Sequence, residues 1–281
     1  MINNTIPSFL KLLESNDIGL HDLNKYYDMH PEAFEEYFKF HCPKTEERLS
    51  SAIEKYPAKL EDILMISETL PSIIQEVSEG CRAQFGLEVN VTFHLFVGAF
   101  GSNAFVEREI IGDIFFAVEK LSPVREHLRV IVAHEIGHIY HNFVLQESGM
   151  DWTNAEWTDA SVSLYREGVA TYLSKQIVKD LSESVYYSYN SDGDPWFQCY
   201  KENEKQIKKR FLQNYIEGWT GEKEKEWFRL SGGNYFGYNR LGYFLGTSYI
   251  EYMVHTFGET EALTFWRKNN LKSSVMEWLQ K

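Results

Sequence analysis

The sequence is organised around one segment, Val130-Ile131-Val132-Ala133-His134-Glu135-Ile136-Gly137-His138-Ile139-Tyr140-His141. Within it, His134, Glu135 and His138 form an H-E-x-x-H pattern. Residues four apart lie on one face of an α-helix, so both imidazoles can reach the same metal ion. Glu135 lies about 100° around the helix from His134. From there its carboxylate can take a proton from a water on the metal. The pattern therefore predicts a metal site on a helix.

Apolar residues occupy the remaining faces of this helix and predict that it is buried in a core. They are Val132, Ile136, Ile139, Tyr140 and Phe143.

A third ligand is needed, because a catalytic zinc ion takes three protein groups. Glu167 is a candidate on a second expected helix, at residues 158–181. Twenty-eight residues separate it from His138, which is enough to leave one helix, turn and run back beside it. Other carboxylates in this part of the chain could serve as the third ligand instead: Glu147, Asp151, Glu156 or Asp159.

The H-E-x-x-H pattern followed by Glu167-Gly168-Val169-Ala170-Thr171-Tyr172 resembles the gluzincin zinc metallopeptidases. The similarity is greatest to the aminopeptidase N-like branch and to related bacterial zinc proteases, and it covers about residues 89–255. It implies that His134, His138 and Glu167 bind one Zn²⁺ per chain and that Glu135 is the general base. It favours Glu167 over Glu156 and Asp159, which come closer to the usual gap in the family but lack the Glu-Gly-x-Ala surround. The gap before Glu167 is longer than in thermolysin-like or aminopeptidase N-like enzymes.

A hydrogen-bond donor to the developing oxyanion is also expected, usually a tyrosine or histidine in gluzincins. Three tyrosines in one glycine-rich segment are candidates: Tyr235, Tyr238 and Tyr243. The resemblance favours Tyr243, because related zinc proteases carry a similar Gly-Tyr-x-x-Gly segment.

Several family features are absent from the sequence. The exopeptidase signature G-x-M-E-N is missing, and Gly98-Ala99-Phe100-Gly101-Ser102 stands in its region without the glutamate. The metzincin pattern is excluded, since it needs glycine and histidine where the chain has His141 and Val144. His141 itself is two turns from His134, ~10 Å along the axis, so we expect it to be packed or to support a ligand.

The composition fits a globular protein with a sizeable core, at 281 residues, 43% hydrophobic and 25% charged. A net charge of −13 argues against a nucleic-acid or anionic-membrane partner. Cys42, Cys81 and Cys199 form no C-x-x-C pair, and we expect buried or unused thiols. Residues 1–17 lack the charged and apolar regions of a secretory signal, so a cytoplasmic location is expected.

The periodicity predicts an α+β protein, and the resemblance implies a zincin-like catalytic domain with a small sheet and active-site helices. Residues 1–85 read as a helical N-terminal region, with prolines 57 and 71 starting or breaking helices, and residues 86–281 as the metallopeptidase domain. Residues 89–97 alternate as a strand with one wet face, which places His94 in solvent. Two more strands are expected at residues 104–108 and 113–119. The resemblance implies an edge strand around residues 96–105 and 114–118 that pairs with an extended peptide.

The expected function is zinc-dependent hydrolysis of a peptide or protein substrate. One alternative is a scaffold, with or without metal, whose helical N-terminal region binds a partner. Glu135 argues against it, because a structural zinc site needs no base and closes its fourth position. A metal hydrolase of non-peptide substrates is the other alternative.

Overall fold

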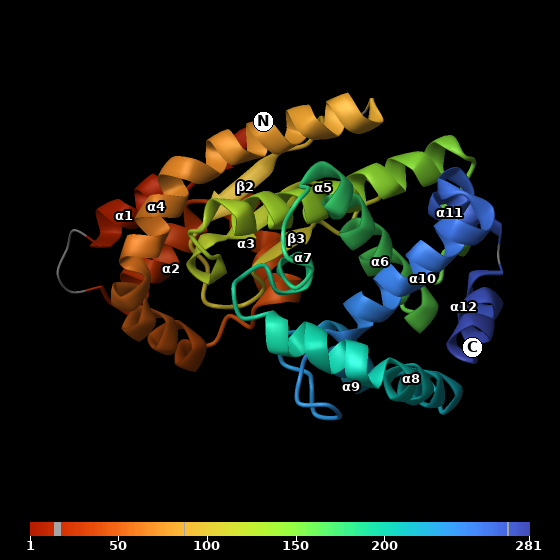
Figure 1. Ribbon diagram of the computed structural model, residues 1–281. Helices are drawn as coiled ribbons and strands as arrows, with labels where there is room; N and C mark the ends of the chain where they lie inside the picture. Colours follow the sequence, from red (N-terminus) through yellow and green to blue (C-terminus); the bar gives the residue numbers. More distant parts are fainter. Residues whose placement is uncertain (14–17, 87, 269) are drawn as a thin grey trace. The chain divides into compact units, whose positions relative to one another are not determined.

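The computed structural model (Figure 1) describes residues 1–13, 18–86, 88–268 and 270–281. Its chain divides into two compact units. The units are Met1–Glu135 and Ile136–Lys281. The division falls inside helix α5 (Arg125–Glu147), which carries the H-E-x-x-H motif. Residues 2–4 pair as a strand with residues 93–95, across the expected domain boundary after residue 85. The domain boundary itself stays a prediction.

The first unit combines helices with a small sheet. Its elements before α5 are β1 (Ile2–Asn4), α1 (Ile6–Leu13), α2 (Leu20–Asp28), α3 (Pro31–Glu36), η1 (Tyr37–His41), α4 (Glu46–Phe85), β2 (Phe93–Phe96), β3 (Ala104–Val106), β4 (Ile114–Ala117) and η2 (Val118–Lys120). The sheet is mixed, with strand order β1-β2-β4-β3. Strands β1, β2 and β4 run parallel, and β3 lies antiparallel to β4 at an edge. A mostly helical chain with a small sheet agrees with the expected α+β class.

The prediction that His94 lies on a wet face is wrong. Strand β2 is buried at all four positions, and so is β4, as is usual for parallel strands covered on both faces. His94 is 5% exposed, and its ring stacks on Phe115 at 4.4 Å between centroids. Its Nε2 lies 3.2 Å from Asp113 Oδ2, and its Nδ1 lies 3.2 Å from Asn3 Nδ2. The alternating pattern could not show this burial, because the side chains around His94 come from residue 3 and from residues 113–115.

Helix α4 contradicts the expectation that Pro57 and Pro71 start or break helices. It is one helix of 40 residues with Pro57 and Pro71 inside it, and Figure 1 shows that it changes direction along its length. A proline inside a helix removes a hydrogen bond and costs ~3 kcal/mol or more. Buried side chains such as Tyr56, Ile63 and Leu70 keep the helix on the core, and their packing offsets that cost.

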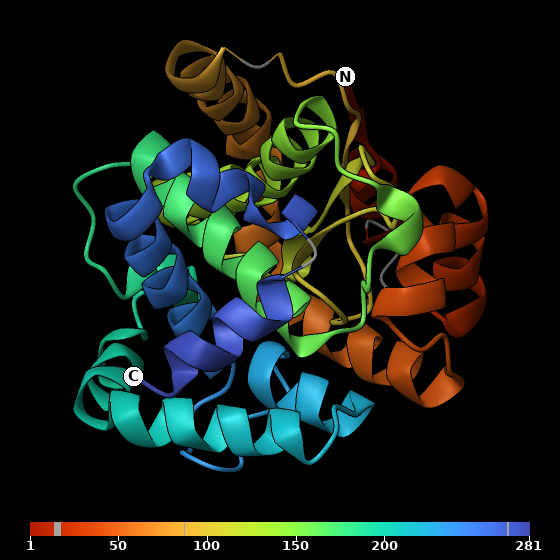
Figure 2. The ribbon, with the colours of Figure 1, turned by 90° about the vertical axis from the view of Figure 1, so that its right-hand side faces the viewer.

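The second unit is helical within the described residues. After α5 its elements are η3 (Trp152–Asn154), α6 (Ala160–Ile177), α7 (Val185–Ser188), α8 (Asp194–Ile216), α9 (Gly221–Phe228), α10 (Leu241–Phe257), α11 (Glu259–Thr264), η4 (Phe265–Lys268) and α12 (Leu271–Leu279). The helix expected to carry Glu167 is therefore present as α6. Helix α10 lies beside α6 (Figure 2). Strand β1 and helices α7 and α9 had no counterpart among the elements expected from the sequence.

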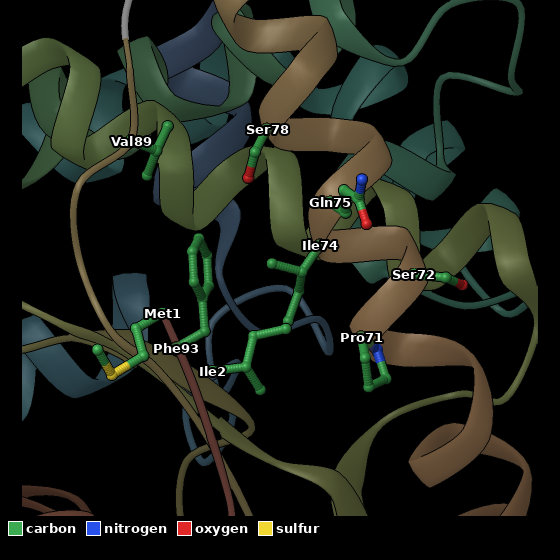
Figure 3. A pocket seen from close by; sticks show the side chains of 9 residues that line it. All are labelled: Met1, Ile2, Pro71, Ser72, Ile74, Gln75, Ser78, Val89 and Phe93. Atoms are coloured by element: carbon green, nitrogen blue, oxygen red, sulfur yellow. The ribbon is translucent and has the colours of Figure 1, made fainter.

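A pocket of about 480 Å³ lies in the first unit, between the start of the chain and α4 (Figure 3). Its walls include Met1, Ile74 and Phe93, and none of the predicted metal ligands lines it. Among the described residues, no helix combines the length and apolar character needed to cross a membrane.

Candidate metal centre

Three side chains, His134, His138 and Glu167, form a group that could hold a metal ion. Each offers one ligand atom, and these atoms all lie within 4.8 Å of one another. His138 Nε2 is 3.5 Å from Glu167 Oε2. Both histidines are buried and Glu167 is partly exposed. The residues that the sequence singled out as ligands are therefore brought together.

Helix α5 positions the two histidines in a buried setting. Residues 130–139 are all buried, including Val132, Ile136 and Ile139 as expected. Glu135 is 6% exposed and belongs to the same stretch. Phe143 departs from the expectation, because it is 39% exposed near the end of the helix. The helix begins at Arg125, shortly after Ser122, whose hydroxyl accepts a hydrogen bond from the Val124 N–H at 3.3 Å.

Gly137 explains how α6 comes close enough to α5 to supply a ligand. A Cβ at Gly137 would lie 3.1 Å from the carbonyl oxygen of Ala170 and 3.2 Å from its Cα. Ala170 stands three residues after Glu167, about one helical turn away. The glycine between the two histidines and the small residue after the glutamate thus allow the helix backbones to approach where the ligands meet.

Gly168 has the same role toward α10. A Cβ there would lie 2.3 Å from both the carbonyl carbon and the oxygen of Gly246. A Cβ at Gly246 would in turn lie 2.2 Å from the Leu164 carbonyl oxygen. In Glu167-Gly168-Val169-Ala170 the glutamate is the ligand candidate, Gly168 admits α10 and Ala170 admits α5. The short motif therefore contains the small residues that let α6 pack closely as well as a candidate ligand.

The other carboxylates considered as third ligand lie outside the only such group found among the described residues. Asp159 is the N-cap of α6, where it accepts a hydrogen bond from Ser161 N at 2.8 Å. Asp151 caps the short helix η3 in the same way. Glu147 and Glu156 are exposed.

His141 is buried and does not belong to the ligand group. Its ring packs edge-on against Tyr165 at 5.1 Å. Burial holds the pKa of His141 well below its usual value, and the Arg166 charge acts in the same direction. These surroundings favour a neutral, packed imidazole.

Glu224 on α9 is a neighbour of the ligand group that the sequence reasoning missed. Its carboxylate accepts hydrogen bonds from Ser163 Oγ at 3.2 Å and from Trp219 Nε1 at 3.1 Å. Ser163 lies one turn before Glu167 on α6. Burial raises the pKa of Glu224, and the charge of Glu167 raises it further. Nothing in the local sequence distinguishes Glu224 from the other acidic residues of α9.

Among the candidate tyrosines, Tyr243 lies in the first turn of α10, three residues before Gly246. Tyr235 is 41% exposed, and Tyr238 is half-buried in the loop before the helix. That loop is held by Glu226, whose carboxylate accepts hydrogen bonds from the backbone N–H groups of residues 233, 234 and 235 at 2.9–3.0 Å. The sequence did not indicate this role of Glu226 either, because the N–H groups that it binds lie in a segment without regular secondary structure.

The loop after β2 holds Gly98-Ala99-Phe100-Gly101-Ser102, the segment that lacks the glutamate of the exopeptidase signature. The N–H groups of Gly98 and Phe100 donate to the buried Glu119 carboxylate at 2.8 and 3.0 Å. The Tyr37 hydroxyl accepts from the Ala99 and Gly101 N–H groups at 2.9 Å. Burial raises the pKa of Glu119 to about 7. Glu119, which lies on η2, thus accepts two backbone N–H groups of the loop after β2.

A comparison with known protein families, curated proteins and solved structures found no match to this chain.

Proposed function

We propose that the protein is a zinc-dependent peptidase of gluzincin type with a zincin-like catalytic domain. The observation that carries the proposal is the convergence of His134, His138 and Glu167, two of them buried, around a common point. Glu135 adds a carboxylate on the same turn of α5, which a purely structural metal site does not need.

The donor set fits zinc. Two imidazole nitrogens and one carboxylate oxygen are the ligands of many catalytic zinc sites, whereas Ca²⁺ and Mg²⁺ prefer oxygen alone. Ligands of a tetrahedral zinc ion with bonds of about 2.1 Å lie about 3.4 Å apart. The separation of 3.5 Å between His138 Nε2 and Glu167 Oε2 matches that value.

Each residue then has a defined role. When bound, zinc polarises the scissile carbonyl and lowers the pKa of water toward about 7. His134, His138 and Glu167 hold the ion, and Glu135 accepts the proton of the attacking water and passes it to the leaving amine. Tyr243 donates a hydrogen bond to the carbonyl oxygen as negative charge develops there. Its place near the crossing of α6 and α10 supports that role.

The test is Glu135→Gln, with Glu147→Gln as matched control on the same helix. Glutamine keeps the shape and helix propensity of glutamate but accepts no proton. We expect Glu135→Gln to bind zinc normally and to lose about 10²–10⁴-fold in kcat on a peptide library. The exposed Glu147 lies outside the ligand group, so its variant keeps both properties. Undiminished peptide cleavage by zinc-loaded Glu135→Gln would exclude this mechanism. If the zinc-loaded wild type cleaves no peptide, that result supports the alternative that the protein is a scaffold.

A further inference from the structure

Arg240 is a buried cation with no anionic partner among the described residues. It is 5% exposed and stands at the N-cap of α10 in the left-handed region, with φ 51°. Its guanidinium lies over the rings of Tyr189, Trp196 and Tyr243, at 5.2, 5.0 and 5.4 Å from their centroids. Its Nε is buried without a hydrogen bond. No ion pair to Arg240 occurs within the part of the chain that the structure describes.

This environment is unusual for an arginine. A guanidinium carries five N–H donors, and a buried charge is normally paired with a carboxylate or phosphate. Contacts with aromatic faces attract the cation but leave its N–H groups without acceptors. The three aromatic rings therefore orient the guanidinium group of Arg240 but do not neutralise its positive charge.

The start of α10 adds a second preference for an anion. This 17-residue helix has no side-chain cap on its first N–H groups, and the positive end of its dipole lies at Arg240. Arg240 is six residues before Gly246, which corresponds to about 9 Å along the helix. Gly246 contacts Gly168, the residue that follows Glu167. An extended peptide covers about 9 Å in two to three residues.

We propose that Arg240 and the start of α10 bind a carboxylate of the substrate, a few residues from the cleaved bond. The inference rests on the proposed peptidase function and names its substrate class, which is short peptides with a carboxylate at that position. The carboxylate can be the C-terminus of the peptide or an acidic side chain. Arg240 is then a specificity-determining residue that acts apart from the metal and Glu135.

The proposed role of Arg240 is tested by measuring peptide binding to a variant that does not cleave the peptide. Zinc-loaded Glu135→Gln protein is titrated, by calorimetry, with hexapeptide pools of neutral sequence that end in a free carboxylate or in an amide. A third pool is amidated and carries one glutamate. We expect the free carboxylate, the glutamate, or both to tighten binding about 10- to 100-fold, the range of a charge-assisted pair with arginine. Adding Arg240→Gln should abolish the difference, and adding Arg240→Lys should restore part of it, since lysine keeps the charge without the fork.

Arg210→Gln is the matched control, because Arg210 also lies over a tyrosine ring, that of Tyr235 at 4.1 Å. It should leave the preference for the carboxylate unchanged. Circular dichroism identifies any variant that has lost its fold, and Arg240→Lys then carries the comparison. Equal affinity for all three pools overturns the assignment of Arg240, even if wild-type protein binds zinc and cleaves peptides. The proposed peptidase function is tested separately: it is wrong if the wild-type protein binds no zinc or cleaves no peptide. Stronger competition by inorganic phosphate than by the acidic peptides would also overturn the carboxylate assignment.

Discussion

Replacing Gly168 by alanine tests whether the crossing of α6 and α10 sets the position of Glu167. Alanine is a better helix former than glycine, so an unobstructed substitution in a helix would stabilise it by up to ~1 kcal/mol. Here the new methyl group would lie 2.3 Å from backbone atoms of Gly246. Backbone cannot rotate away as a side chain can, so the two helices must separate.

The size of the effect follows from that distance. Ordinary contact begins near 3.4 Å, so the helices must part by about 1 Å. Forcing one extra methyl group into a packed contact costs about 1–3 kcal/mol. Zinc ligands tolerate about 0.2 Å, so a shift of Glu167 on this scale should also weaken zinc binding, by about 10- to 100-fold.

Two further glycines give a graded series for the assay. A Cβ at Gly137 would lie 3.1 Å from Ala170, and a Cβ at Gly221 meets nothing within 4 Å. We expect zinc affinity, measured by competition with a chromophoric chelator, to fall most for Gly168→Ala, less for Gly137→Ala and not at all for Gly221→Ala. The melting temperature should fall by about 2–12 °C for Gly168→Ala, at roughly 2–4 °C per kcal/mol.

A Gly168→Ala protein with the melting temperature and the zinc affinity of the wild type would show that the α6–α10 crossing does not set the position of Glu167. The same conclusion follows if Gly221→Ala loses as much of either property, because that residue has open space around it.

Other predictions address single carboxylates and ligands. His138→Ala and Glu167→Ala should each lose most of the about one zinc per chain expected of the wild type, as measured by atomic absorption; full occupancy in either would remove that residue from the site. Since burial raises the pKa of Glu119 to about 7, its contribution to stability is fully present below pH ~4.5 and declines by the order of 3 kcal/mol as pH rises through 7. In urea unfolding between pH 5 and 8, Glu119→Gln should reduce the decline in the free energy of unfolding. An unchanged dependence on pH would contradict the assignment of that decline to Glu119. Glu226→Ala removes the acceptor of three backbone N–H groups and should cost about 1–3 kcal/mol and speed hydrogen exchange in residues 233–235. Glu222→Ala, an exposed change on the same helix, should do neither.

The sequence alone determined the parts of the candidate site that depend on local geometry. Two histidines four residues apart share a helix face whatever the rest of the chain does, because the rise and turn of the α-helix are fixed. The apolar residues around them predicted burial, and residues 130–139 are buried. Glu167 was preferred as the third ligand because Glu167-Gly168-Val169-Ala170 resembles a family motif, whereas the close helix packing at Gly168 and Ala170 is seen only in the tertiary structure.

Only the tertiary structure decided what depends on residues far apart in the chain. His94 is surrounded by side chains from distant segments, residue 3 and residues 113–115. Helix α4 continues through two prolines because packing in the core offsets the free-energy cost of the prolines. Helix propensity, a property of the local sequence, does not include this packing. Glu224 and Arg240 carry no local signal, since their surroundings are assembled from separate helices and a loop. Spacing and periodicity specify single helices and strands, whereas burial and pairing of charges are properties of the packed chain.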